Sequence, residues 1–231
     1  MTTTIDLSFR IMGDSVAYDH AYALYSALAR FNAGWHEAQW LGIHTIKGLA
    51  FKDAIRLTPF SELRLRAPTE KLPELIRLAG KRLILKTDSR HDQILIGVPQ
   101  VLSLWASPIL RSSCVTIKIS EVENTERTPD REMFLSAAQK QLAAHKIAGD
   151  LWIDDSLDTQ GRERSRRVLH IKHKTIIGYA VTVSNLSDED SLRLQVEGLG
   201  GRRKFGCGLF FPVRSEHVNE DRQRVFALSS E

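Results

Sequence analysis

Cysteine is scarce in this sequence. Cys114 and Cys207 are the only two cysteines among its 231 residues. Two thiols are too few for a disulfide framework or for a four-cysteine zinc site. We therefore expect a protein of a reducing compartment, and the cytoplasm fits best.

Long hydrophobic runs are missing as well. No apolar stretch approaches the roughly 18 residues that a helix needs to cross a bilayer, so we expect no membrane partner. Residues 1–10 lack the basic start and the apolar run of a signal peptide, and nothing in them predicts export. Hydrophobic residues still make up 42% of the chain, which is enough for a core and excludes disorder as the main state.

Negative charge does not dominate. The formal net charge is +4 and the pI is about 9.1, a value that favours a polyanionic partner. The basic side chains gather in two runs in the second half of the chain, one within residues 162–174 and one at residues 202–204. Either run alone is compatible with a solvated surface, but two runs in one half favour an anion-binding face.

The first half of the chain has the pattern of one small α+β domain. Apolar and polar residues alternate over residues 5–11, as in a strand with one buried face. Helical spacing follows over residues 18–31, where Asp19 is a plausible N-cap or first-turn acid. A second helix is expected at residues 68–78, and further strands at residues 40–47, 61–66, 82–85 and 93–98. The order β-α-β-β-α-β, with one extra strand, is typical of the ferredoxin-like fold.

The second half repeats this pattern after a connector expected at residues 99–113. We expect helices at residues 129–147 and 184–191, and strands at residues 115–119, 151–153, 168–171, 176–183, 192–196 and 209–213. The strands on either side of residues 172–175 are expected to form a hairpin with a basic turn. We therefore predict an α+β protein of two tandem ferredoxin-like βαββαβ domains, at residues 1–98 and 114–215, followed by a tail at residues 216–231.

The segment at residues 198–208 is the most specific signal in the chain. Five of the fourteen glycines lie in these eleven residues, around three consecutive cations. Glycine permits positive φ and close approach of another molecule, and exposed amides in such a loop can cradle phosphate oxygens. A plain tight turn is the alternative. The P-loop pattern fails because no Ser or Thr follows the lysine, and the dinucleotide pattern fails because a strand, not a helix, is expected next.

The spacing of this segment resembles a known family. Gly198-Leu199-Gly200, five residues, then Gly206-Cys207-Gly208 is similar to the C-terminal glycine-rich loop of the CRISPR-associated repeat endoribonucleases, the Cas6 group of the repeat-associated mysterious protein superfamily. Residues 19–30 and 41–48 resemble the myxococcal subtype of that group. The resemblance implies two tandem ferredoxin-like domains and cleavage of precursor CRISPR RNA without a metal or cofactor, by attack of a 2′-hydroxyl on the adjacent phosphate.

The resemblance also implies the partners and a catalytic histidine. The partners are CRISPR repeat RNA with a short stem-loop, the mature guide RNA and further subunits of an effector complex. Histidine suits proton transfer near neutral pH, and in the family it commonly follows the first helix. His44 fits that placement, with Lys47 as a cation for the transition state. His20 is the second candidate, Arg30 is a second cation, and a strand histidine without a role is the alternative for His44.

RNA contacts are expected from the hairpin and the glycine-rich segment. Their cations would bind phosphates, and Phe205 would stack on a base. The expected residues are Arg162, Arg164, Arg166, Arg167, His170, Lys172, His173, Lys174, Gly198, Gly200, Gly201, Arg202, Arg203, Lys204, Phe205, Gly206 and Gly208. The acidic residues Asp154, Asp155 and Asp158 are the weakest option, as a cation site, and we expect no metal.

Two other functions fit the same residues. One is a non-cleaving RNA-binding subunit of the same superfamily. The other is a generic ferredoxin-like RNA-recognition module, which should carry an aromatic strand of the RNP1 type, and none is evident.

Overall fold

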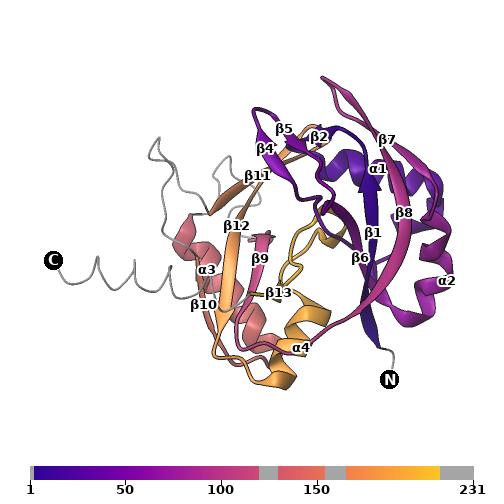
Figure 1. The fold of residues 1–231 in the computed structure, drawn as a ribbon. Helices are drawn as coiled ribbons and strands as arrows, with labels where there is room; N and C mark the ends of the chain where they lie inside the picture. The colour runs from indigo at the N-terminus through magenta and orange to yellow at the C-terminus, as the bar shows by residue number, and fades with distance from the viewer. Residues whose placement is uncertain (1–2, 120–129, 154–164, 214–231) are drawn as a thin grey trace.

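The computed structural model describes residues 3–119, 130–153 and 165–213. Two antiparallel sheets stand side by side, with α1 and α2 against the first sheet and α3 against the second (Figure 1). Within the described part of the chain, no helix has the length and apolarity that a membrane span requires.

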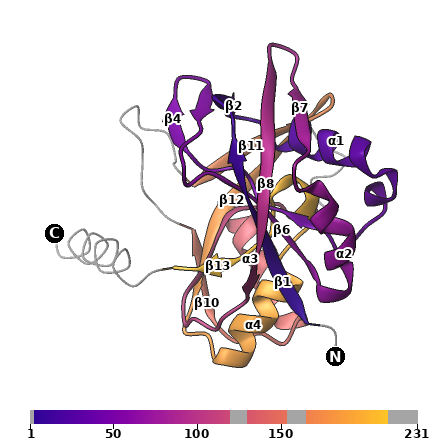
Figure 2. The ribbon, with the colours of Figure 1, turned by 45° about the vertical axis from the view of Figure 1, so that its right-hand side comes forward.

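The first sheet has the strand order β3-β6-β1-β8-β7. Its members are β1 (Thr4–Met12), β3 (Gly42–Ile43), β6 (Glu62–Pro68), β7 (Arg82–Lys86) and β8 (His91–Ser103). Figure 2 shows β8 running along the sheet beside β1. A separate small sheet is formed by β2 (Ser15–Ala17), β4 (Leu49–Phe51) and β5 (Ala54–Arg56).

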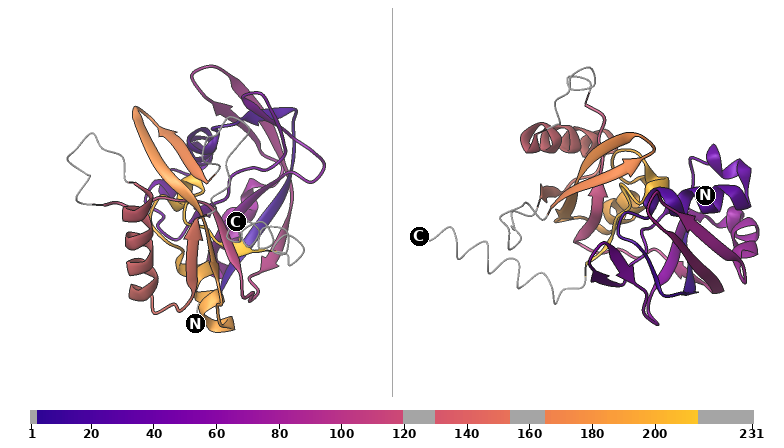
Figure 3. Two further views of the ribbon diagram at one scale, coloured as in Figure 1. Left: turned by 90° about the vertical axis from the view of Figure 1, so that its left-hand side faces the viewer. Right: turned by 90° about the horizontal axis from the view of Figure 1, so that it is seen from above.

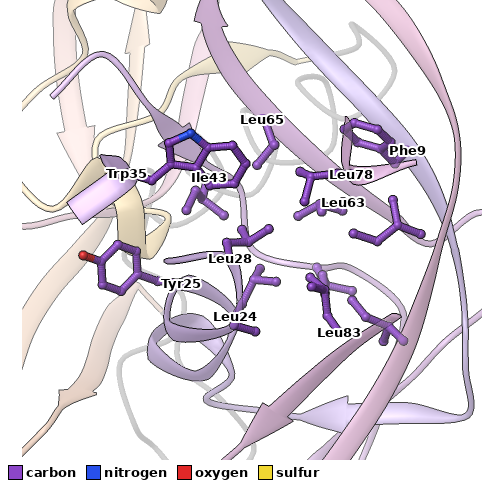
Figure 4. Packing of buried hydrophobic residues seen from close by; sticks show 14 of the residues in the cluster. Phe9, Leu24, Tyr25, Leu28, Trp35, Ile43, Leu63, Leu65, Leu78 and Leu83 are labelled. Carbon is purple, nitrogen blue, oxygen red and sulfur yellow. The ribbon is translucent and has the colours of Figure 1, made fainter. Parts of the chain in front are cut away.

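Alternation along β1 builds the first core. Leu7 and Phe9 are fully buried because they face α1 (Ala21–Phe31), whose Leu24 and Leu28 are buried against them (Figure 4). The second helix is short: α2 (Leu72–Leu75) is flanked by 3₁₀ turns, Thr69–Lys71 and Ile76–Leu78. The intervening side chains of β1 point to the opposite face, which no helix of this domain covers.

Three expectations for this half were wrong in detail. The strand expected at residues 40–47 is only β3, because the backbone amide of Ile46 donates to the ring of His20 instead of to a strand. Asp19 is not a helix cap, because its carboxylate accepts hydrogen bonds from His170 in the second half of the chain. The strand expected to end at residue 98 continues to Ser103 by pairing with β1.

The second sheet has the order β10-β12-β9-β13, and β11 pairs with β12. Its strands are β9 (Leu110–Val115), β10 (Asp150–Ile153), β11 (Arg166–Ile171), β12 (Lys174–Ser184) and β13 (Phe211–Pro212). Its helices are α3 (Arg131–Ala144) and α4 (Asp188–Glu197). The expected hairpin is confirmed as β11–β12 and projects from the sheet toward the first domain (Figure 3).

The strand expected at residues 192–196 was wrong, since these residues belong to α4. Ser187 caps this helix by accepting a hydrogen bond from the amide of Asp190. Three acidic side chains in the first turn stabilise the helix further by interacting with the positive end of its dipole. The strand expected at residues 115–119 is instead β9, at Leu110–Val115, so it begins within the residues expected as a connector.

One buried arginine ties the two sheets together. Arg66 of β6 forms a bidentate pair with Asp6 of β1, at 2.7 and 2.9 Å. Its remaining terminal nitrogen donates to the carbonyl oxygens of Gln195, at 2.9 Å, and Phe210, at 2.7 Å, in the second half of the chain. The guanidinium therefore fixes how α4 and the end of the glycine-rich loop lie against the first sheet.

Candidate active site and RNA interface

The glycine-rich loop, residues 198–208, lies between the two sheets (gold in Figure 1). It packs on β3: a Cβ at Gly206 would lie 2.7 Å from Cγ2 of Thr45. Gly206 also has a φ of +78°, a conformation that glycine adopts without steric cost. The loop therefore brings the second half of the chain against the residues that follow β3.

The glycines serve packing rather than an open phosphate cradle. A Cβ at Gly198, Gly200 or Gly208 would lie 2.1–2.2 Å from a backbone oxygen. Amides along the loop already donate within the protein, at Gly198, Leu199, Gly200, Gly201, Phe205, Gly206, Cys207 and Gly208. The expectation that these glycines bind RNA through their amides is therefore not supported by the geometry.

The three cations of the loop have different surroundings. The Arg203 guanidinium donates to the carbonyls of Val196, at 2.7 Å, and Glu197 at the end of α4, and burial lowers its pKa. Lys204 donates to the carbonyl of His36. Arg202 is the exposed member, held at a φ of +64° at the start of the 3₁₀ turn Arg203–Phe205. Arg203 is therefore a helix-capping residue, and Arg202 is the cation presented to solvent.

A hydrogen-bonded Tyr–His pair lies beside this loop. Oη of Tyr25 on α1 is 2.6 Å from Nδ1 of His36, an exposed residue of the 3₁₀ turn Ala33–His36. Figure 4 shows the Tyr25 hydroxyl at the edge of the core, pointing away from Leu24 and Leu28. Burial raises the pKa of Tyr25, so its phenol stays protonated and can donate to the imidazole.

His36 was missed in the sequence. It follows the first helix, which is the placement implied for a catalytic histidine. However, no strand was expected at this position, because a glycine precedes it, and His44 on an expected strand was chosen instead. The structure places it next to Lys204, which donates to its carbonyl oxygen. The ring of Tyr25 lies between His36 and Phe205, and the centroids of the Tyr25 and Phe205 rings are 4.9 Å apart. An exposed imidazole, a phenol that orients it and a neighbouring cation are suited to proton transfer at a phosphate.

Phe205 does not have the exposed position expected of a base-stacking residue. Its ring packs on Tyr22, with centroids 6.2 Å apart, and edge-on against Tyr25. It is an anchor that holds the loop on α1.

His44 lies on the other face of the first sheet. Its Nε2 is buried without a hydrogen-bond partner, 3.8 Å from Oδ1 of Asp6, and its side chain is 14% exposed. Burial lowers the pKa of His44 to about 4; Asp6 opposes this shift, and Arg66 and Arg64 add to it. Asp6 alternates with the core residue Leu7 along β1, so His44 and the Tyr25–His36 pair face opposite sides of the sheet.

Lys47, expected beside His44, lies over the Phe211 ring, with Nζ 4.2 Å from its centroid. Burial lowers the pKa of Lys47, and the nearby Arg64 and Arg111 lower it further. Lys47 is thus part of a basic group on the face of the first sheet opposite α1, and the sequence interpretation missed both arginines.

His20 and Arg30 are held away from the loop cations. His20 is buried; its Nδ1 donates to the carbonyl of Ala17 and its Nε2 accepts from the amide of Ile46, both at 2.9 Å. Burial lowers its pKa, so it is a neutral structural residue. Arg30 donates to the carbonyl of Ile84 on β7, at the edge of the sheet opposite β3. Neither residue is placed to act on a substrate beside His36.

The hairpin presents most of its expected RNA contacts to solvent. Arg166, His170, Lys172, His173 and Lys174 are exposed. Arg167 is partly buried and donates to the carbonyl of Ser113 at 3.2 Å. Arg162 and Arg164, and also Asp154, Asp155 and Asp158, lie outside the described residues. Among the residues that are described, no three metal-ligating side chains cluster.

A family model described as "Cas6 Crispr" matches residues 5–215. The chain belongs to the Cas6 family. A curated relative, the "CRISPR-associated endonuclease Cas6" of Myxococcus xanthus (strain DK1622), is 32% identical over 208 residues, which cover 90% of this chain and 81% of the relative.

Solved structures of Cas6 proteins share this fold. One titled "CRISPR associated protein Cas6" has a TM-score of 0.64 at 13% identity, over 91% of this chain and 100% of that one. A second, "Characterization of a Cas6-related gene from Pyrococcus furiosus", has a TM-score of 0.62 at 12% identity, over 92% and 99%. The family assignment and the fold therefore agree with the resemblance carried by the glycine-rich segment.

Proposed function

We propose that this Cas6-family chain is a metal-independent endoribonuclease that cuts CRISPR repeat RNA in precursor transcripts to release guide RNA. The observation that carries this proposal is the exposed imidazole of His36, hydrogen-bonded to the buried Tyr25 beside the cationic glycine-rich loop. The 32% identity with a CRISPR-associated endonuclease supports the activity.

In the proposed reaction the 2′-hydroxyl attacks the adjacent phosphate. The hydroxyl proton leaves to a base, the P–O5′ bond breaks, and the departing 5′-oxygen takes a proton. The products are a 2′,3′-cyclic phosphate, which can open later, and a 5′-hydroxyl. His36 performs a proton transfer at this phosphate, Tyr25 orients its ring, and Lys204 with Arg202 stabilises the negative charge of the phosphorane.

His36 replaces His44 as the first candidate on physical grounds. An imidazole whose pKa is about 4 stays neutral at pH 7 and is a poor acid there, and its buried Nε2 faces the Asp6–Arg66 pair rather than solvent. His44 and Lys47 remain the second candidate pair, and the experiment below separates the two histidines.

We also propose that the fold is two ferredoxin-like units. The first ends with β8 at Ser103 rather than at residue 98, and the second begins with β9 at Leu110 rather than at residue 114, so the connector expected at residues 99–113 shortens to residues 104–109. The strand orders β3-β6-β1-β8 and β10-β12-β9-β13 support this, since in each unit the first and third strands of a βαββαβ chain are central. The repeat RNA would lie across the loop and the β11–β12 hairpin, whose cations bind the phosphates of a short stem-loop. The cut guide RNA would stay bound and carry the protein into an effector complex.

The test is cleavage of repeat RNA by the purified chain in EDTA. We expect cleavage to survive chelation, to be lost in His36→Ala while binding persists, and to continue in His44→Ala. A deoxyribose before the cut should abolish cleavage, since it removes the nucleophile. Loss of cleavage in His44→Ala but not in His36→Ala would reverse the assignment, and binding without any cleavage would favour the non-cleaving subunit.

A further inference from the structure

A cleft of about 610 Å³ opens at the start of α1, away from the loop cations. Its walls come from both halves of the chain: the residues before and at the start of α1, the β4–β5 turn, the β7–β8 turn, and the tip of the β11–β12 hairpin. His170 of the hairpin closes one side, with Nδ1 2.8 Å from Oδ2 of Asp19. The cleft is therefore an interface between the two halves.

Three lysines on the rim of this cleft lack an acidic partner. Lys52, Lys86 and Lys172 are exposed; Lys52 and Lys172 lie in the β4–β5 and β11–β12 turns, and Lys86 is the last residue of β7. No carboxylate of the described residues lies within ion-pair distance of these lysines. Arg90, which also lines the cleft, is paired with Asp92 at 2.6 Å. Free lysines converging from three parts of the chain favour an anion with several charged groups.

The cleft also contains a free aromatic ring. Tyr18 is 60% exposed, and the ring of a tyrosine is a surface on which a nucleobase stacks. Asp53 and Asp88 line the same cleft, and carboxylates accept hydrogen bonds from the amino groups of bases. This mixture fits a nucleotide, with phosphates on the lysines and the base between Tyr18 and the acids, better than a bare phosphate.

An aromatic path joins the cleft to the candidate active site. Tyr22 lines the cleft and stacks on Phe205, with centroids 6.2 Å apart. Phe205 meets Tyr25 edge-on at 4.9 Å, and Tyr25 is bonded to His36. An RNA strand held at His36 therefore reaches the cleft within a few nucleotides of the scissile phosphate.

We propose that this cleft binds unpaired ribonucleotides next to the cut, with one base stacked on Tyr18 and the neighbouring phosphates on Lys52, Lys86 and Lys172. The inference rests on the proposed function and adds a single-strand subsite to it. The site recognises the part of the repeat outside the stem, so it contributes to the choice of cut position.

The experiment compares two repeat RNAs that carry a deoxyribose before the cut, one a bare stem-loop and one with its unpaired flanks. Wild-type protein should bind the flanked RNA more tightly. Tyr18→Ala should lower affinity for the flanked RNA by about tenfold, within the range of one stacked base, and leave the bare stem-loop unchanged. Lys86→Ala should reduce the salt dependence for the flanked RNA by about one phosphate contact.

Trp105→Ala and Lys140→Ala are matched controls, because both side chains are exposed and lie outside the cleft. A Tyr18→Ala effect no larger than that of Trp105→Ala, or equal on both RNAs, would overturn the cleft assignment while wild-type cleavage of the same RNAs made with ribose throughout still supports the proposed function. If wild-type protein neither binds the two deoxyribose-containing RNAs nor cuts their all-ribose forms, the proposed function fails, and this inference fails with it.

Discussion

The phenol of Tyr25 holds the imidazole of His36 through a hydrogen bond of 2.6 Å between Oη and Nδ1. The two rings also meet edge-on, with centroids 5.5 Å apart. Because α1 fixes Tyr25 and the following 3₁₀ turn fixes His36, the ring orientation is set before RNA binds. An imidazole held in this way presents Nε2 in a defined direction.

The first prediction follows from that bond. Tyr25→Phe keeps the ring that packs on Phe205 and removes only the hydroxyl. One hydrogen bond is worth about 1 kcal/mol, so we expect single-turnover cleavage to slow by roughly fivefold at unchanged RNA affinity. His36→Ala should slow it by about 10²–10⁴-fold, the range of general acid–base catalysis.

Tyr22→Phe is the control for this prediction, since Tyr22 also packs on Phe205 and its hydroxyl makes no hydrogen bond to a histidine of the described residues. Equal rates for Tyr25→Phe and wild type would show that the phenol does not orient His36. An equal fall in affinity would instead assign Tyr25 to RNA binding.

The second prediction concerns the Asp6–Arg66 pair. Arg66→Leu leaves a buried carboxylate and the carbonyls of Gln195 and Phe210 without their partner. Removing one member of a buried ion pair costs about 3–5 kcal/mol, and we expect that loss in the free energy of unfolding from urea titration. Arg64→Ala removes a partly exposed pair with Glu62 and a longer contact of 3.9 Å with Asp6, which keeps its pair with Arg66, so it should cost about 1 kcal/mol or less. Similar losses for the two variants would contradict a joining role for Arg66.

The pH dependence of stability gives the third prediction. Burial lowers the pKa of His44 from 6.5 to about 4, so between these values the unfolded chain binds a proton that the folded chain does not. Stability must therefore fall as the pH drops from 6.5 toward 4. His20, whose pKa burial also lowers, acts in the same direction. Below about pH 4, protonation of Asp6 in the unfolded chain adds to the loss, because the hydrogen bonds from Arg66 and the nearby His44 imidazole outweigh burial and lower the pKa of its carboxyl.

His44→Gln tests this linkage, because it removes one of the two buried imidazoles. We expect the fall in unfolding free energy between pH 6.5 and 4 to become shallower, by at most about 1.4 kcal/mol per pH unit. His91→Gln, at an exposed strand position, should leave the slope as it is in wild type. An unchanged slope in His44→Gln would mean that His44 titrates normally in the folded chain.

The sequence-based predictions that the structure confirmed are those that depend on residues close together in the sequence. Alternation over residues 5–11 predicted β1, and the hairpin around residue 172 follows from two alternating segments with a polar turn. Leu192, Leu194 and Val196 also alternate, but there the cap of Ser187 and the acids after it favour a helix, and that signal was given too little weight.

The site depended on contacts that no local pattern carries. Nothing near His44 in the sequence indicates that Asp6 and Arg66, 38 and 22 residues away, surround it. Phe205 was expected to be free because the sequence does not show that α1 places two tyrosines under it. The glycine spacing located the loop correctly, yet the amides were expected to be open because the sequence does not show that the loop folds on itself or that Gly200, Gly201 and Gly208 donate to Gln141, Thr116 and Cys114 far along the chain.

The glycine-rich loop offers the fourth prediction, and its own residues provide the control. Gly206→Ala places a methyl group 2.7 Å from Cγ2 of Thr45 at a φ of +78°, so the loop must move off β3. Gly201→Ala meets nothing within 4 Å and has no positive φ. We expect Gly206→Ala to lower the melting temperature and slow cleavage, because Lys204 and Phe205 move with the loop, and Gly201→Ala to change neither. Equal behaviour of the two alanine variants would contradict tight docking of the loop on β3.

The fifth prediction separates two adjacent arginines that the sequence treats alike. Arg202 is exposed, so Arg202→Ala should weaken RNA binding, reduce the dependence of the affinity on salt by about one phosphate contact and leave the melting temperature unchanged. Arg203 caps α4 through two carbonyls, so Arg203→Ala should lower the melting temperature, and the salt slope of the protein that remains folded should match wild type. Fluorescence anisotropy across a salt series measures both slopes. If Arg203→Ala reduces the salt dependence of the affinity while Arg202→Ala does not, Arg203 makes the phosphate contact. Arg203 must then leave the carbonyls of α4 when RNA binds.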